Sequence, residues 1–395
     1  MRVAILNARV TDARGERRES VFVEGERIVP SLSAEAERVI DAGGHALLPA
    51  LTDTHTHLRD PGYPEKETME TGMRAALKGG YAALCAMANT RPVMETPALV
   101  EANHRKAEAL GLCRLIQAGA AGVGLGDAVP TDRAALAKVT KVISNDGQTI
   151  FSDDFMRRLL IDSREHGFLV STHCQPERAT VKRDLALLKE VGGNLHIGHI
   201  STAETVDMIR AAKSEEPALV MGYLRGTGRS LTCEVMPHHI FAWDDPYRVN
   251  PPIRSRADVE ALLEGIRDGT IDCLATDHAP HTPENKAAGM AGISNIEHAF
   301  SIFLKVFYDN GIPLSRLLEM GARNTALLLG TGTGLIGPGE RADLMLADTE
   351  AEGIIRTRDM LSRSRNTPFE GRAVRGRILK TIVGGNILYD NGQAL

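Results

Sequence analysis

Eight short apolar segments, each ending in polar residues, constrain the fold of this 395-residue chain more than any other feature. In chain order they are ALLPALTDTHTH, YAALCAMANT, CRLIQAGA, KVISND, FLVSTHC, NLHIGHIS, LTCEVMPHH and DCLATDHAP. Longer amphipathic segments of helical spacing separate them. Alternation of strands and helices predicts parallel βα units, and eight such units close a (β/α)8 barrel in roughly 250 residues. We therefore predict an α/β fold with a TIM-like barrel.

The two ends of the chain have a different pattern. Residues 1–48 and 335–395 both alternate apolar and polar side chains between glycine-containing turns, which is typical of short antiparallel strands. We expect these two segments to form one small β-sandwich domain, and residues 49–334 to form the barrel domain.

Composition and charge exclude several classes of protein. The 46 basic and 51 acidic residues give a net charge of −5, and no basic run indicates a nucleic-acid surface. No apolar stretch approaches the roughly 20 residues that span a bilayer, and the early charges of the N-terminus do not resemble a signal peptide. The five cysteines are scattered, as is typical of reduced thiols. We expect a cytoplasmic protein that acts on a small molecule.

The polar residues at the ends of the apolar segments are of the kinds that bind metals and substrates. In a (β/α)8 barrel the carboxyl ends of the strands gather at one face, where active sites lie. The candidates at these ends are His55, His57, Asn89, Asp146, His173, His199 and Asp277. Since six strand ends carry such residues, we predict that they converge on one site.

The histidines predict a metal site. His55 and His57 are two residues apart, so on a strand both imidazoles point to the same side and can hold one ion. His173 and His199 suggest a second pair on facing strands, and Asp277 can supply a carboxylate. Imidazole and carboxylate ligands suit zinc.

Two neighbouring cations need an anionic bridge, either a carboxylate or a lysine carbamylated by CO2. Lys138 and Lys141 precede the end of the fourth strand and are not placed at the site. Asp146 follows KVIS and precedes a glycine turn, as expected at a strand end. Asp153 and Asp154 instead match the first turn of a capped helix. Asp146 is therefore the preferred bridge, and Asp153 and Asp154 are the alternatives.

These segments resemble the motifs of bacterial class I dihydroorotases, within the amidohydrolase superfamily. The motifs that occur in family order are DTHTHLRDPG with KETMETGMRAALKGGY, MANTRP, SNDG, THCQ, GHIST, EVMPHH, NPPIRS, ATDHAPHT, GISNIE, GPGERADLML and RNTPFEG. The chain departs from the family at Ala88, where proline is usual, and at Asn145, where aspartate is usual. The resemblance extends nearly from end to end.

The resemblance implies a reaction and a set of roles. A dihydroorotase reversibly cyclises N-carbamoyl-L-aspartate to (S)-dihydroorotate plus water in de novo pyrimidine biosynthesis, and an activated hydroxide opens the cyclic amide in the reverse direction. The implied ligands of two zinc ions per subunit are His55, His57, Asp146, His173, His199 and Asp277. Asp277 would also shuttle the proton. The implied substrate contacts are Arg59, Asn89, Asn250 and His281.

Two other functions are open. Another cyclic amidohydrolase, such as a hydantoinase or allantoinase, generally bridges its metals with a modified lysine and lacks the pairing of Arg59 with Asn89. A non-catalytic relative would act only as a partner of aspartate transcarbamoylase, but here all the expected ligands are present. The resemblance also implies a homodimer, with aspartate transcarbamoylase as a further partner left open. Residues 282–294 are placed where they could cover the pocket.

Overall fold

The computed structural model describes residues 1–391, and parallel strands form the centre of the fold. These strands are β6 (Leu51–Thr56), β7 (Tyr81–Ala86), β8 (Arg114–Gln117), β9 (Gly119–Ala120), β10 (Val142–Ser144), β11 (Leu169–Thr172), β12 (Gly193–Ile197), β13 (Arg229–Val235) and β14 (Cys273–Leu274). Each of the eight predicted segments contains a strand, and the third contains both β8 and β9. The predicted number and order of barrel units are therefore confirmed.

The barrel closes at two places. One sheet has the order β6-β7-β8 and the other β14-β13-β12-β11-β10-β9, and a single residue separates β8 from β9. On the opposite side, the Asp277 amide donates to the His55 carbonyl at 3.0 Å, and the His57 amide donates to the His278 carbonyl at 2.8 Å. The first barrel strand, β6, is therefore hydrogen-bonded to the segment that follows the last barrel strand, β14.

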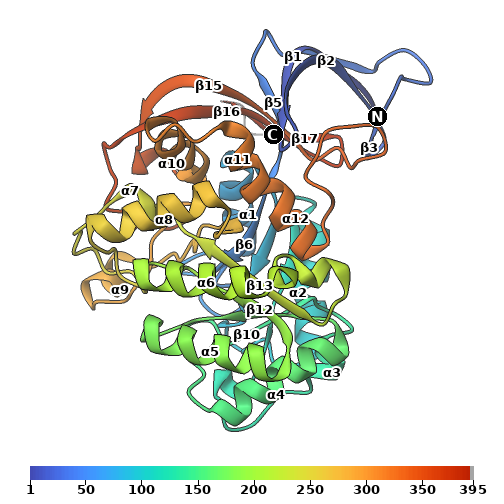
Figure 1. The fold of residues 1–395 in the computed structure, drawn as a ribbon. Coiled ribbons are helices and arrows are strands. Elements are labelled where there is room, and N and C mark those ends of the chain that lie inside the picture. The colour runs from blue at the N-terminus through green and yellow to red at the C-terminus, as the bar shows by residue number, and fades with distance from the viewer. Residues whose placement is uncertain (392–395) are drawn as a thin grey trace.

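Helices surround the barrel (Figure 1). They are α1 (Met69–Lys78), α2 (Pro97–Leu110), α3 (Arg133–Leu136), α4 (Asp153–His166), α5 (Glu177–Val191), α6 (Ala203–Glu215), α7 (Pro237–Phe241), α8 (Arg256–Asp268), α9 (Pro283–Ala287), α10 (Ile296–Asp309), α11 (Leu314–Leu318) and α12 (Asn324–Leu329). Local sequence sets their ends: the Ser152 side chain accepts from the Phe155 amide at the start of α4, and Gly167 ends it in the left-handed conformation. No helix among residues 1–391 is long and apolar enough to cross a membrane.

Strands from both ends of the chain form a small β-domain. They are β1 (Arg2–Asp12), β2 (Gly15–Glu24), β3 (Arg27–Val29), β4 (Arg38–Asp41), β5 (Ala46–Pro49), β15 (Leu344–Ile354), β16 (Ala373–Val383) and β17 (Asn386–Asp390). They belong to one sheet in the order β17-β16-β15-β5-β1-β2-β3, with β4 beside β1. Antiparallel pairing of β5 with β15 joins the two ends of the chain.

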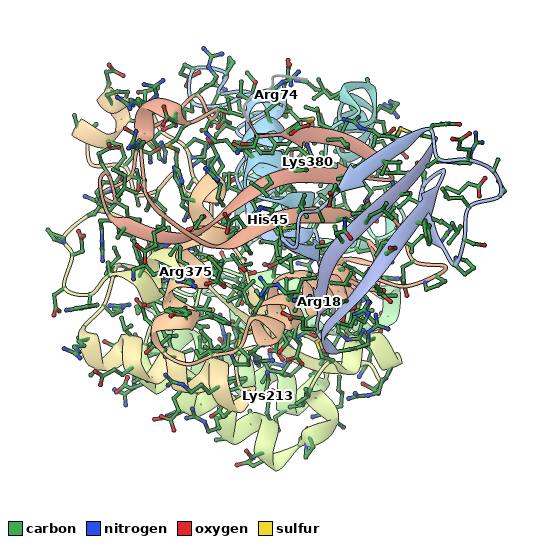
Figure 2. The ribbon with its side chains drawn as sticks, turned by 90° about the horizontal axis from the view of Figure 1, so that it is seen from above. Arg18, His45, Arg74, Lys213, Arg375 and Lys380 are labelled. Atoms are coloured by element: carbon green, nitrogen blue, oxygen red, sulfur yellow. The ribbon has the colours of Figure 1, made fainter. Side chains whose placement is uncertain are left out.

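Alternation along β15 connects the β-domain to the barrel. Leu344 and Leu346 belong to the apolar cluster of the β-domain, whereas Met345 and Ala347 belong to the barrel cluster. Successive side chains of a strand point to opposite faces, so one strand contributes to both cores. Figure 2 shows the red strands of this sheet lying across the molecule, with Lys380 on β16, which packs against α10 and α1.

We propose that the domains divide into residues 1–48 with 335–395 and residues 49–334. Only Ala50 separates β5 from β6 at the first boundary. At the second boundary, α12 ends at Leu329 and β15 begins at Leu344. Residues 392–395 of the proposed β-domain lie outside the described part.

Asp12 links the first hairpin to the returning chain. Its fully buried carboxylate accepts from the Arg14 guanidinium at 2.6 Å, from Arg17 at 3.2 Å and from the Ile336 amide at 3.2 Å. Both arginines also donate to the Ile336 carbonyl at 2.6 Å. Burial raises the pKa of Asp12, but hydrogen bonds from Arg14 and the Ile336 amide, together with the charge of Arg17, outweigh burial and lower this pKa to about 2.

Replacing Asp12→Asn is expected to lower the free energy of unfolding by about 1 to 2 kcal/mol at neutral pH, because one pKa unit corresponds to about 1.4 kcal/mol and Arg14 is half-exposed. Because folding lowers the pKa of Asp12, its ionised carboxylate stabilises the protein at pH values above its pKa in the unfolded chain, which is about 4. This stabilisation disappears as the pH falls toward about 2. Urea unfolding of both proteins from pH 7 to pH 3 measures the difference. A difference that stays constant below pH 4 would contradict this role.

Candidate metal centre

Five of the predicted ligands meet at the carboxyl ends of the barrel strands. They form two groups, His55 with His57 and Asp146, and Asp146 with His173 and His199. Within each group, one ligand atom per residue lies within 4.8 Å of the others, and all five side chains are buried. The two groups share Asp146, which lies between the two histidine pairs.

Asp146 is the centre of this cluster. Its Oδ1 lies 3.2 Å from His55 Nε2 and 3.5 Å from both His173 Nδ1 and His199 Nε2. Its Oδ2 lies 3.3 Å from His57 Nε2. Asp277 adds a second carboxylate, with Oδ1 at 3.0 Å from His57 Nε2 and 3.8 Å from His55 Nε2. The structure therefore brings all six candidate ligands together.

The alternative bridging residues are placed elsewhere. Asp153 and Asp154 lie in the first turn of α4, and their side chains are 62% and 97% exposed. Asp153 pairs with Arg183 and Asp154 with Arg157. Neither carboxylate belongs to the buried cluster, so the position of Asp146 supports its choice as the bridge.

The outer nitrogens of three imidazoles are held by neighbouring side chains. His55 Nδ1 lies 2.7 Å from Glu234 Oε1, and His57 Nδ1 lies 2.9 Å from Asn89 Oδ1. His173 Nε2 lies 3.2 Å from Asn250 Nδ2. Such contacts fix the ring orientation and direct the other nitrogen toward the centre of the cluster.

The donor set fits a divalent cation. Burial raises the pKa of Asp146 and of Asp277, but the surrounding histidines outweigh burial and hold both pKa values below the ordinary range. His55 Nε2 is buried and has no hydrogen-bond partner among residues 1–391. Carboxylates grouped with imidazole nitrogens in this way are among the ligands that zinc prefers.

Backbone strain occurs at three of the predicted site residues. Arg59, His199 and Asp277 have φ angles of 57°, 34° and 45°. Positive φ is uncommon for residues other than glycine, and such conformations concentrate at functional sites, where the surrounding structure enforces them. Two of these residues end barrel strands, where the chain must turn sharply to direct a ligand inward.

The predicted substrate residues lie beside the cluster. The Arg59 guanidinium donates to the Pro280 carbonyl at 3.2 Å and lies 3.2 Å from His281 Nε2. No carboxylate of residues 1–391 forms an ion pair with Arg59. Asn89 contacts His57 and Asn250 contacts His173, so these amides orient imidazoles of the cluster.

The segment 282–294 is fastened at several points. It contains α9, and the Lys286 ammonium donates at 2.9 Å to the carbonyls of Arg248, Met290 and Gly292. The bond to Arg248 connects the segment to the loop that carries Asn250, and the other two bonds lie within the segment. Its role as a cover stays a prediction.

Comparison with known proteins agrees with this geometry. Residues 46–388 match the model of the amidohydrolase family. The chain is 36% identical to a dihydroorotase of Anaeromyxobacter dehalogenans, over 90% of this chain and 89% of that protein. It is 33% identical to a dihydroorotase of Caldanaerobacter subterraneus, over 100% of this chain and 98% of that protein.

The chain belongs to the amidohydrolase family. Its resemblance to dihydroorotases is thus confirmed, and it is a cyclic-amide hydrolase. The fold is also that of a solved L-hydantoinase from Arthrobacter aurescens, with a TM-score of 0.88 and 23% identity over 100% of this chain and 97% of that chain. A dihydropyrimidinase from Brevibacillus agri gives a TM-score of 0.87 at 22% identity over 100% and 96% of the two chains. These likenesses confirm the barrel with its terminal β-domain.

Glu234 is a residue of the amidohydrolase site that the sequence did not reveal. It lies on β13, is fully buried, and accepts from Thr54 Oγ1 as well as contacting His55. Its Oε2 lies 3.0 Å from His196 Nε2. Burial raises its pKa, but His196 and His55 lower the pKa below the ordinary range. The sequence feature that could have indicated Glu234 is a carboxylate inside the apolar segment LTCEVM, because a buried charge requires a partner.

The hydrogen bonds of Asn145 account for one of the two departures from the family pattern. Its Oδ1 accepts from the amides of Ala121 and Gly122 at 3.1 and 3.2 Å. Its Nδ2 donates to the carbonyls of Leu125 and Gly126 at 2.9 and 3.2 Å. An aspartate could accept the first two bonds but would place an oxygen against two carbonyls. This loop conformation therefore favours the amide.

Replacing Glu234→Gln is expected to weaken metal binding about 10- to 100-fold, the usual effect of losing an outer carboxylate partner of a ligand histidine. Competition with a chelator, followed by metal analysis, measures the affinity. Glu260→Gln, on the exposed face of α8, is the control. Unchanged affinity in a folded Glu234→Gln variant would contradict the orienting role of Glu234.

Replacing Asn145→Asp is expected to lower the free energy of unfolding by about 1 to 3 kcal/mol, because a buried carboxylate oxygen would face two carbonyl oxygens without a donor between them. Chemical denaturation at neutral pH measures this difference. Asn386→Asp, at an exposed position of β17, provides a control with the same change in charge. Equal stabilities of the two variants would show that the amide of Asn145 is not required.

Proposed function

We propose that this amidohydrolase is a dihydroorotase, which interconverts N-carbamoyl-L-aspartate and (S)-dihydroorotate in de novo pyrimidine biosynthesis. The observation that carries the proposal is the partly buried Arg59 guanidinium, which lies beside the ligand cluster without an ion-pair partner among residues 1–391. Dihydroorotate carries a carboxylate, and a planar guanidinium can bind a carboxylate through two hydrogen bonds. The relatives named dihydroorotase support the same substrate.

We infer that the cluster holds two zinc ions. His55, His57 and Asp277 would hold one ion, His173 and His199 the other, with Asp146 between them. When bound, the ions would lower the pKa of water toward neutrality and polarise the amide carbonyl. The four imidazoles and two carboxylates match the ligand preferences of zinc.

The side chains of the chain supply orientation and proton transfer. Asp277 is ionised at neutral pH, because its neighbouring histidines keep its pKa below the ordinary range although burial raises it. Its carboxylate can therefore take a proton from the attacking water and give it to the ring nitrogen as the amide C–N bond breaks. In the biosynthetic direction the same proton moves in reverse. Arg59 would hold the substrate carboxylate in place throughout.

The other two functions have less support. Solved hydantoinases share the fold, but neighbours at 20–23% identity support the fold alone. The candidate bridging position holds Asp146 instead of a modified lysine. A purely non-catalytic role would not require six buried ligand side chains around one centre.

Localisation and partners are proposed from the sequence. All five cysteines are buried and unpaired, which supports a reducing compartment such as the cytoplasm. A homodimer and a complex with aspartate transcarbamoylase stay predictions from the family resemblance.

The test is a parallel assay of the purified, zinc-loaded protein with dihydroorotate, hydantoin and allantoin. We expect turnover of dihydroorotate to exceed that of the other two. His55→Ala should reduce activity and bound zinc by more than the roughly 10- to 100-fold effect of losing an outer partner. His45→Ala, before β5 and outside every group that could hold a metal ion among residues 1–391, should change neither. Hydantoin turnover without dihydroorotate turnover would refute the proposal.

A further inference from the structure

Lys66 is a buried cation without an anionic partner. The residue is 8% exposed and lies between β6 and α1. Its ammonium lies 4.0 Å from Met290 Sδ and 4.8 Å from the centre of the Tyr63 ring. No carboxylate of residues 1–391 lies within ion-pair distance of it. Lys213, which is 7% exposed, instead pairs with Asp272 at 2.6 Å.

The neighbouring glutamates do not neutralise Lys66. Glu65 is exposed to solvent. Glu67 accepts from the Ser362 hydroxyl and from the Arg363 amide at 3.1 Å, and it contacts His278. Of the two carboxylates adjacent to Lys66 in the sequence, one is therefore exposed to solvent and the other is already hydrogen-bonded to other groups.

Local turns place Lys66 beside Arg59. The Tyr63 amide donates to the Arg59 carbonyl at 3.0 Å, and the Lys66 amide donates to the Tyr63 carbonyl at 3.0 Å. Burial and the positive charge of Arg59 both lower the pKa of Lys66. Burial, then Arg59, then Lys66 lower the pKa of His281 to about 3. Contacts connect the three side chains: the Lys66 ammonium lies against Met290, and His281 Nε2 lies 2.9 Å from the carbonyl oxygen of the next residue, Ala291, and 3.2 Å from the Arg59 guanidinium.

A buried cation near a partly buried one is unfavourable when neither has an ion-pair partner, because both lose hydration and they repel each other. The segment that follows the ligands His55 and His57 nevertheless contains both. A bound carboxylate would relieve this repulsion and would accept hydrogen bonds from both side chains.

We propose that Lys66 is a second cation for the substrate carboxylate, and that with Arg59 it makes the site select cyclic amides that carry a carboxylate. The inference rests on the proposed dihydroorotase function and adds a specificity residue to it. Arg59 binds and orients the carboxylate, and Lys66 completes its neutralisation. The same ring without the carboxylate, 5,6-dihydrouracil, gains nothing from Lys66.

The experiment compares the zinc-loaded wild type with Lys66→Met, using dihydroorotate and dihydrouracil. We expect the KM for dihydroorotate to rise roughly 10- to 100-fold, the effect of losing one hydrogen bond between charged groups, while kcat changes by less than about threefold. Turnover of dihydrouracil should not fall. Lys66→Arg, which keeps the charge, should retain most of the affinity. Lys305→Met, on the exposed side of α10, is the control.

Lys66→Gln provides a second neutral side chain in case the methionine variant does not fold, and thermal unfolding verifies both. A KM for dihydroorotate within about threefold of wild type in a folded neutral variant would overturn the role of Lys66 alone. A fall in kcat at unchanged KM, or equal losses for both substrates, would also overturn it. A wild type that does not turn over dihydroorotate would overturn the proposed function as well.

Discussion

Closure of the barrel between β6 and β14 is the constraint on which the site depends. Asp53, fully buried at this junction, accepts from the His55 amide at 3.1 Å and from the amide and hydroxyl of Thr276 at 3.0 and 2.6 Å. Burial raises the pKa of Asp53 to about 7, although these hydrogen bonds oppose the shift. One carboxylate thus ties the strand that carries His55 and His57 to the turn that carries Asp277. Together with the backbone hydrogen bonds from Asp277 to His55 and from His57 to His278, this connection fixes the separation between the two sides of the ligand cluster.

Charge in the site is divided between two adjacent regions. The strand ends gather carboxylates and imidazoles, whose outer nitrogens are fixed by Glu234 and Asn89. The loop after β6 instead contains Arg59 and Lys66, neither of which has an ion-pair partner among residues 1–391. Since a low local dielectric strengthens both effects, a substrate must present a polarisable carbonyl to one region and a negative charge to the other. A cyclic amide that carries a carboxylate meets both requirements.

The sequence predicted the barrel because apolar segments of strand length alternate with amphipathic ones, and it predicted the ligand residues because polar side chains end those segments. The sequence also distinguished Asp146 from Asp153 as the bridging candidate. Asp146 follows an apolar strand segment, whereas Asp153 follows a serine that caps a helix. Glu234 escaped prediction because its partner, His55, is distant in sequence and only pairing across the barrel brings them together. Asn89 and Asn250 were predicted as substrate contacts, and the imidazole contacts of both depend on side-chain positions that spacing does not give.

The terminal β-domain contributes to the site through the connection between β15 and β16. Ser364 Oγ accepts from the His281 amide at 3.1 Å, and Asn366 Nδ2 donates to the Gly292 carbonyl at 3.0 Å. In the same connection, Ser362 donates to Glu67, which follows Lys66 directly. Both loops that surround the cationic pair are therefore held by one segment from outside the barrel. This arrangement explains why a β-domain built from the chain ends accompanies the barrel: it fixes loops that strand pairing alone would leave free.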